Sequence, residues 1–197
     1  MLKADPRKNV AEWISMLLNA PLVASYAFII LAFAKRSSPF FGLISVVFAT
    51  IIPLGFTYYL LKRGKISDYY ASNRETRLLP FAGATLSYLL GTVTLFVTRA
   101  PFIMTALMFC YFSNTLTMML INFRWKISIH ASGITGPTTA VVYELGPNMV
   151  PLFLLLVPVA WARLKLKAHS LQQVLAGASL TIAITWLQLE ILLNYVL

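Results

Sequence analysis

The 197-residue chain is 59% hydrophobic and only 11% charged, which excludes an ordinary soluble domain and predicts an integral membrane protein. Its formal net charge is +10, but the basic residues occur in short segments between apolar runs. This pattern favours anionic membrane lipids and phosphorylated substrates as partners, and it excludes nucleic acid. Cys110 is the only cysteine, so the sequence also excludes an intrachain disulfide and a multi-cysteine metal site.

Apolar runs without charges divide the chain into candidate membrane spans. Runs long enough, or nearly so, to cross ~30 Å of hydrocarbon occur at 13–34, 40–61, 78–98, 100–123, 127–143, 145–162 and 168–189. We therefore predict an all-α polytopic bundle of six to seven transmembrane helices, forming a single domain over residues 1–197. The first run is interpreted as a retained anchor, because it is too long for a signal peptide and lacks an obvious cleavage site.

The first polar cluster follows the second run and covers residues 68–80. Arg74 and Arg77 are three residues apart, so on a helical turn they would project from one side and bracket one anion. A solvated interfacial loop is the alternative interpretation of this pair.

A second cluster follows two further apolar runs. Arg124 and Lys126 lie just before Ser128 and His130, at the start of the fifth run. A histidine in an apolar run is usually a packing residue, but an ionisable group in a membrane segment is costly unless it is functional. The nearby cations add to this argument, so we predict that His130 belongs to a functional site.

The third cluster lies where a polar connection enters the last apolar run. Arg163 precedes His169 by six residues, and Gln173 follows His169 by four. If a helix begins near His169, the Gln173 amide shares a face with the imidazole and can hold it. The helix N-terminus favours an anion, and the arginine offers a planar donor fork for phosphate. This stretch predicts a phosphoryl site at a membrane surface.

The third cluster resembles the third motif of the type 2 phosphatidic acid phosphatase superfamily, which is Arg, five residues, His, three residues, Asp. Arg163 and His169 match this motif, and the segment continues as Val-Leu-Ala-Gly up to Gly177. Gln173 stands where the family has Asp. An amide in that position can fix the imidazole tautomer, but it carries no charge to stabilise an imidazolium.

The other two clusters resemble the remaining motifs in part. The second motif is Pro-Ser-Gly-His, of which Ser128 and His130 match. The first is Lys, six residues, Arg-Pro; aligning Arg77 with its arginine puts Tyr70 at the lysine, and Arg74 is a candidate replacement.

The resemblance implies a metal-independent, cofactor-free mechanism. His169 would attack phosphorus to give a phosphohistidine, while His130 would protonate the leaving group and then activate water. Arg77 and Arg163 would hold the non-bridging oxygens, and the secondary phosphate-binding candidates are Arg74, Lys126 and Ser128.

The function that these expectations favour is dephosphorylation of a membrane-embedded lipid, either an isoprenoid diphosphate or a glycerophospholipid monophosphate. One alternative is a catalytically weak phospholipid-binding or carrier protein of the same fold. A second, an intramembrane polyprenyl transferase, requires paired Asp-rich motifs that bind magnesium, and the chain has only Asp5 and Asp68.

The number of apolar runs between the clusters predicts their sidedness. Two runs separate Arg77 from His130, and two more separate His130 from His169, so all three clusters are expected at one membrane face. That face would carry thirteen lysines and arginines, against three on the other at positions 35, 36 and 99. The positive-inside rule then predicts a cytoplasmic active face.

Overall fold

A computed structural model of the chain describes residues 6–68 and 75–195, and within these ranges the regular structure is helical, without a strand. The prediction of an all-α membrane bundle is thereby confirmed. In this described part of the chain, five helices are long and apolar enough to cross a membrane, and the bent pair at its N-terminal end supplies a sixth crossing if it counts as one span. The chain is therefore an integral membrane protein.

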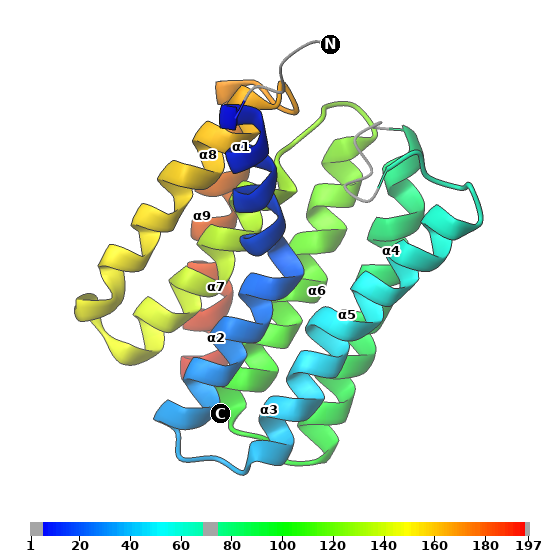
Figure 1. The fold of residues 1–197 in the computed structure, drawn as a ribbon. Coiled ribbons are helices and arrows are strands. Elements are labelled where there is room, and N and C mark those ends of the chain that lie inside the picture. Colours follow the sequence, from blue (N-terminus) through cyan, green and yellow to red (C-terminus); the bar gives the residue numbers. More distant parts are fainter. Residues whose placement is uncertain (1–5, 69–74, 196–197) are drawn as a thin grey trace, which may run out of the picture.

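The helices follow one another with short connections (Figure 1). Their bounds are α1 Pro6–Leu17, α2 Ala20–Ala34, α3 Pro39–Val46, the π-helical turn η1 Val47–Ile51, α4 Ile52–Lys62, the short η2 Glu75–Arg77, α5 Leu78–Val97, α6 Phe102–Asn122, α7 Ile129–Leu145, the 3₁₀ segment η3 Pro147–Leu155, α8 Leu156–Lys165 and α9 Leu171–Tyr195. The elements α3, η1 and α4 together form one crossing, as do η3 and α8.

The first crossing differs from the continuous run at 13–34 that the sequence predicted. Helix α1 already begins at Pro6, and it meets α2 at an angle of 48°. The break has a local cause, because the Asn19 side chain accepts a hydrogen bond from the Leu22 N–H at 2.9 Å and so caps a new helix. Pro21 lacks the N–H that a continuous helix would need there.

Helix α7 is the most enclosed element and lies between α2 and α9. Twelve of its 17 residues are buried, and small residues let the neighbouring backbones approach. A Cβ atom added to Gly133 would lie 2.6 Å from the Ala20 Cα, and one added to Gly177 would lie 2.6 Å from the Ser128 carbonyl oxygen. Close packing of α7 against α9 therefore sets the relative positions of the two polar segments that precede them.

Several connections gather at one end of the bundle. Figure 1 shows α1, the α6–α7 connection, the α8–α9 connection and the start of α5 at the upper end, whereas the α2–α3 and α5–α6 connections lie at the lower end. Two helices, α5 and α6, lie between Arg77 and His130, and two helical segments, α7 and the η3–α8 pair, lie between His130 and His169. Helix α7 is not among the five candidate spans of the described residues. The polar clusters come from distant parts of the chain and reach the same end.

The contact between Gly177 and the Ser128 carbonyl yields a stability test. We expect Gly177→Ala to lower the free energy of unfolding in detergent by about 1–3 kcal/mol, because the added methyl group overpacks the α7–α9 contact. Thermal unfolding followed by circular dichroism measures the effect. Gly55→Ala in α4 is the matched control, since nothing lies within 4 Å of the added atom. Equal stabilities of the two variants would contradict the proposed role of this contact.

Candidate functional site

Five of the residues singled out in the sequence lie together at the upper end of the bundle. They are Arg77 at the start of α5, Lys126 and His130 around the α6–α7 connection, Arg163 in the last turn of α8, and His169 before α9. His169 is within electrostatic range of Arg77, Arg163 and Lys126. His130 is within range of His169 and of both arginines. We refer to these five residues as the cationic site.

The two arginines of the cationic site are deeply buried. Arg77 and Arg163 are each only 2% exposed, and they are close enough to repel each other. An Arg77 Nη1–H donates to the Ile127 carbonyl oxygen at 3.3 Å, which holds the guanidinium near the α6–α7 connection. Burial of like charges is unfavourable unless counter-charge is supplied. Asp68 provides part of this counter-charge for Arg77, and a bound anion would add to it.

A network at the start of α9 fixes the His169 ring. The Gln173 Oε1 accepts hydrogen bonds from the Ser170 N–H at 3.1 Å and from His169 Nδ1 at 3.2 Å. The Ser170 Oγ in turn accepts the Gln173 N–H at 3.3 Å, which completes a capping box. The helix therefore begins at Leu171, two residues later than the sequence suggested, and His169 lies just outside it. The predicted contact between imidazole and amide is nevertheless formed.

This network determines which nitrogen of His169 carries the proton. A backbone N–H can only donate, so the Gln173 atom that faces Ser170 is the carbonyl oxygen, and Nδ1 of the imidazole must be the protonated nitrogen. The lone pair of the neutral ring is then on Nε2. Burial, together with the charges of Arg77, Arg163 and Lys126, lowers the pKa of His169 to about 3, against the smaller opposing effect of Gln173. His169 is thus a neutral nitrogen base among cations.

The second imidazole and the second arginine share a partner on α1 that the sequence had not indicated. His130 Nε2 donates to the Ser15 carbonyl oxygen at 3.3 Å, and an Arg163 Nη1–H donates to the Ser15 hydroxyl at 3.4 Å. Ser15 is fully buried. The sequence around Ser15 does not indicate these hydrogen bonds, because they form only where α1 packs against α8. In the neutral ring of His130, Nδ1 therefore carries the lone pair.

The three secondary candidates for phosphate binding, Ser128, Lys126 and Arg74, differ in their surroundings. Ser128 is fully buried and caps α7, since its Oγ accepts the Ala131 N–H at 3.4 Å. Its own N–H donates to the Gln173 carbonyl oxygen at 3.2 Å and ties the α6–α7 connection to α9. Lys126 is partly exposed, and burial together with Arg77 and Arg163 lowers its pKa. Arg74 lies outside the residues that the structure describes. A phosphate-binding role for Ser128, Lys126 and Arg74 stays a prediction.

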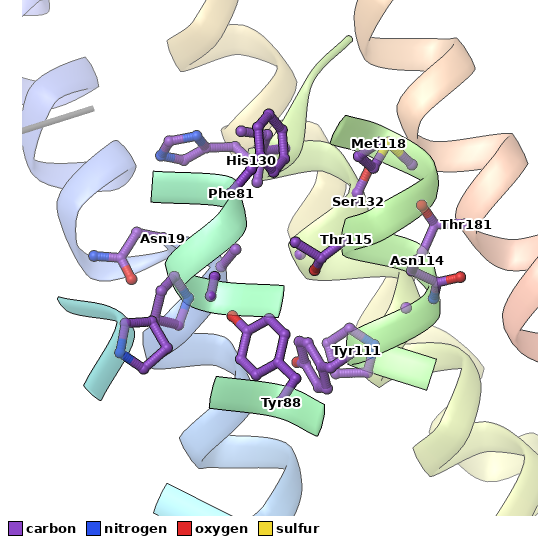
Figure 2. A pocket seen from close by; sticks show the side chains of 18 of the residues that line it. Asn19, Phe81, Tyr88, Tyr111, Asn114, Thr115, Met118, His130, Ser132 and Thr181 are labelled. Atoms are coloured by element: carbon purple, nitrogen blue, oxygen red, sulfur yellow. The ribbon is translucent and has the colours of Figure 1, made fainter. Parts of the chain in front are cut away.

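A cavity leads from the cationic site into the bundle (Figure 2). Arg77 and His130 line one end, and mostly apolar side chains from α2, α4, α5, α6, α7 and α9 line the rest. Its volume is about 170 Å³, many times the ~10–15 Å³ that one water molecule needs. Asn19, Pro21, Pro53 and Thr57 are among the lining residues, so the break between α1 and α2 borders the cavity. The arrangement can hold an anionic head and an attached chain.

The residues at this site suit an anion better than a metal ion. Within the described ranges, no three His, Cys, Asp or Glu side chains are grouped so that they could hold a metal. Helices α7 and α9 both begin at the site, and their N-terminal N–H groups favour negative charge. Two buried arginines, a lysine and two helix termini thus form an environment that attracts a tetrahedral oxyanion.

Comparison with known proteins adds no assignment, since no family model, no curated protein and no solved structure matches the chain.

The surroundings of His169 yield a titration test. We expect its imidazole to stay neutral, with the proton on Nδ1, between about pH 5 and 8, because its pKa lies near 3. Nitrogen NMR of histidine-labelled protein in detergent reports the state of the ring. Gln173→Asp serves as the comparison and should raise the pKa, since a carboxylate stabilises the imidazolium. Titration of the wild-type ring near its ordinary value of 6.5 would contradict this electrostatic description.

Proposed function

We propose that the protein is a metal-independent lipid phosphatase that hydrolyses a phosphomonoester or diphosphate of an isoprenoid or glycerophospholipid through a phosphohistidine. One observation carries the proposal: the neutral His169, with its Nε2 lone pair free of the Gln173 contact, lies among the buried guanidinium groups of Arg77 and Arg163. A nucleophile beside fixed cations is what transfer of a phosphoryl group requires.

Substrate binding uses the charges of the site. The non-bridging oxygens of the phosphate would accept hydrogen bonds from Arg77 and Arg163, with Lys126 at the more exposed side. The anion offsets the repulsion between these cations, so binding relieves part of the cost of their burial. It also favours the protonated form of His130, because the positive field around that ring is weakened.

The first chemical step is attack of His169 Nε2 on phosphorus. A P–N bond forms while the bond from phosphorus to the leaving oxygen breaks, and protonated His130 donates a proton to that oxygen. The hydrogen bond from Nδ1 to Gln173 keeps the ring oriented as charge develops on it. Gln173 supplies no negative charge, so the arginine-bound phosphoryl group itself is the principal counter-charge to the imidazolium.

The second step regenerates the enzyme. Neutral His130 takes a proton from a water molecule, whose oxygen attacks phosphorus as the P–N bond breaks. The products are inorganic phosphate and His169 with its lone pair restored on Nε2. His130 Nε2–H donates to the Ser15 carbonyl oxygen at 3.3 Å, which fixes the orientation of the ring. Nδ1 is therefore the nitrogen that donates and accepts the proton.

A lipid substrate is favoured by the position of the cavity. The cavity links Arg77 and His130 to the apolar interior of a membrane-embedded bundle, as Figure 2 shows for His130 at one end and Tyr88 and Tyr111 at the other. An amphiphile whose phosphate binds at the rim can place its chain in this space. A small water-soluble phosphate ester would leave the apolar cavity unused.

The cytoplasm is the proposed location of the active face. The connections at the site end carry most of the lysines and arginines, whereas Lys35, Arg36 and Arg99 belong to the connections at the other end. Even without Arg77, Arg124, Lys126 and Arg163, seven basic residues of the described part of the chain lie at the site's end, at positions 7, 8, 62, 63, 65, 165 and 167, against three at the other end. This excess follows the positive-inside rule.

The proposal is tested by phosphate release from phosphatidic acid and farnesyl diphosphate in mixed micelles that contain a metal chelator. We expect wild-type protein to release phosphate from at least one of them. His169→Ala should lower kcat by at least about a thousandfold, because the nucleophile is lost. Arg77→Lys and Arg163→Lys should lower kcat/KM, since lysine cannot donate two parallel hydrogen bonds to a phosphate.

Arg99→Lys is the control for the arginine variants, because Arg99 lies at the other end of the bundle. Thermal unfolding establishes that His169→Ala remains folded. Binding of either lipid without phosphate release would support the alternative of a phospholipid carrier. That alternative is motivated by Gln173, which lacks the negative charge of the Asp in the family motif. Undiminished hydrolysis by His169→Ala would contradict the proposed mechanism.

A further inference from the structure

The far end of the cavity contains polar groups that lack partners. Tyr111, Asn114 and Thr181 line it and are 8%, 9% and 2% exposed. The Tyr111 hydroxyl, the Asn114 Oδ1 and the Thr181 hydroxyl have no hydrogen-bond partner among the described residues. Unsatisfied buried polar atoms are rare in folded proteins. Three of them on one cavity indicate that its occupant carries a polar group, and we call these residues the polar cluster.

Two members of the polar cluster, Asn114 and Thr181, lie close together although they come from different helices. A Cβ atom at Gly136 would meet the Thr181 Cγ2 at 2.9 Å and the Asn114 Nδ2 at 4.0 Å, so α6 and α9 bring both residues to the same point on α7. Tyr111 precedes Asn114 by three residues on α6 and therefore projects from the same side. Its ring lies 5.4 Å from that of Tyr88. Figure 2 shows these side chains at the side and end of the cavity away from His130.

The hydrogen-bonding capacity of the polar cluster selects a hydroxyl group. Asn114 Nδ2 donates to the Thr185 Oγ1 at 2.8 Å, but a hydroxyl partner is compatible with either orientation of the amide. The amide then needs a donor in one orientation and an acceptor in the other. A hydroxyl group on the occupant supplies both, whereas a hydrocarbon supplies neither and a carbonyl only accepts. No Asp or Glu is among the described residues that line the cavity, so an ammonium group finds no counter-charge there.

The helical rise gives the distance between the polar cluster and the cationic site. Gly136 lies six residues beyond His130 on α7, and Thr181 lies eight residues beyond Gln173 on α9. At 1.5 Å per residue these separations are ~9 and ~12 Å. With single bonds of ~1.5 Å, an extended chain covers them with roughly seven to ten carbon atoms.

We propose that the cavity selects phosphorylated amphiphiles whose chain carries a hydroxyl group roughly seven to ten carbon atoms from the phosphate. The inference rests on the proposed function for its phosphate end, and it narrows the substrate class to hydroxylated chains. The phosphate binds at the cationic site, and the hydroxyl group binds at the polar cluster. A plain hydrocarbon chain leaves the Tyr111 hydroxyl, the Asn114 Oδ1 and the Thr181 hydroxyl without partners.

Two probes of nearly equal length test the inference: nonyl phosphate and ω-hydroxyoctyl phosphate, in which a hydroxyl group replaces the terminal methyl group. Calorimetry with purified full-length protein in detergent measures Kd for each, and phosphate release is followed in parallel. We expect wild type to bind the hydroxylated probe about five- to tenfold more tightly. Thr181→Val and Tyr111→Phe should each reduce that ratio toward one, because each removes only a hydroxyl interaction.

Thr139→Val is the matched control, since Thr139 is equally buried and its hydroxyl donates to the Thr135 carbonyl oxygen at 2.7 Å. It should keep the wild-type ratio. Equal affinities of wild type for both probes, binding of neither probe, or a ratio that survives in both Thr181→Val and Tyr111→Phe would overturn the inference. Preferential binding of the hydroxylated probe without phosphate release would support the inference and contradict only the proposed hydrolase activity.

Discussion

Burial of two guanidinium groups at one end of a membrane bundle is the constraint on which the rest of this structure depends. Arg77 and Arg163 come from different halves of the chain, and both are almost fully enclosed. Burial of the His169 imidazole, together with their charges, keeps it neutral, and the charges make the site favourable for an anion. The same buried charges therefore help to leave His169 neutral, as a nucleophile must be, and attract the phosphoryl group that His169 would attack.

Contacts between helices position the charged groups and the two imidazoles of the site. Gly177 lets the start of α7 lie against α9, and the Ser128 N–H bonds to the Gln173 carbonyl oxygen at this contact. Gln173 then completes the capping box with Ser170 and holds His169. On the other side, Ser15 of α1 binds both His130 and Arg163. Gln173, in the first turn of α9, thus orients His169, and Ser15, on the neighbouring helix α1, orients His130.

The sequence predicted the helical membrane bundle because charged residues delimit the apolar runs, and membrane burial leaves few alternatives to helices. The run at 127–143 became α7, which is not among the candidate spans of the described residues. The even numbers of apolar runs between Arg77, His130 and His169 were enough to predict that they share one end. The sequence did not predict the break at Asn19, where one apolar run is divided by a cap and a proline. It also gave no indication of Ser15 or of the unpartnered atoms of Thr181 and Asn114. These features arise where separate helices meet, and such contacts leave no periodic signal in any one segment.

Trapping of a covalent phosphoenzyme tests most directly whether His169 Nε2 is a nucleophile within a cluster of buried cations. Wild type and His169→Ala would be incubated with a radiolabelled lipid phosphate, quenched and separated from free lipid. We expect labelled wild-type protein whose label is lost in acid and retained in alkali, as a phosphohistidine requires, and no label on His169→Ala. A label that resists acid, or one that persists on His169→Ala, would contradict this role of His169.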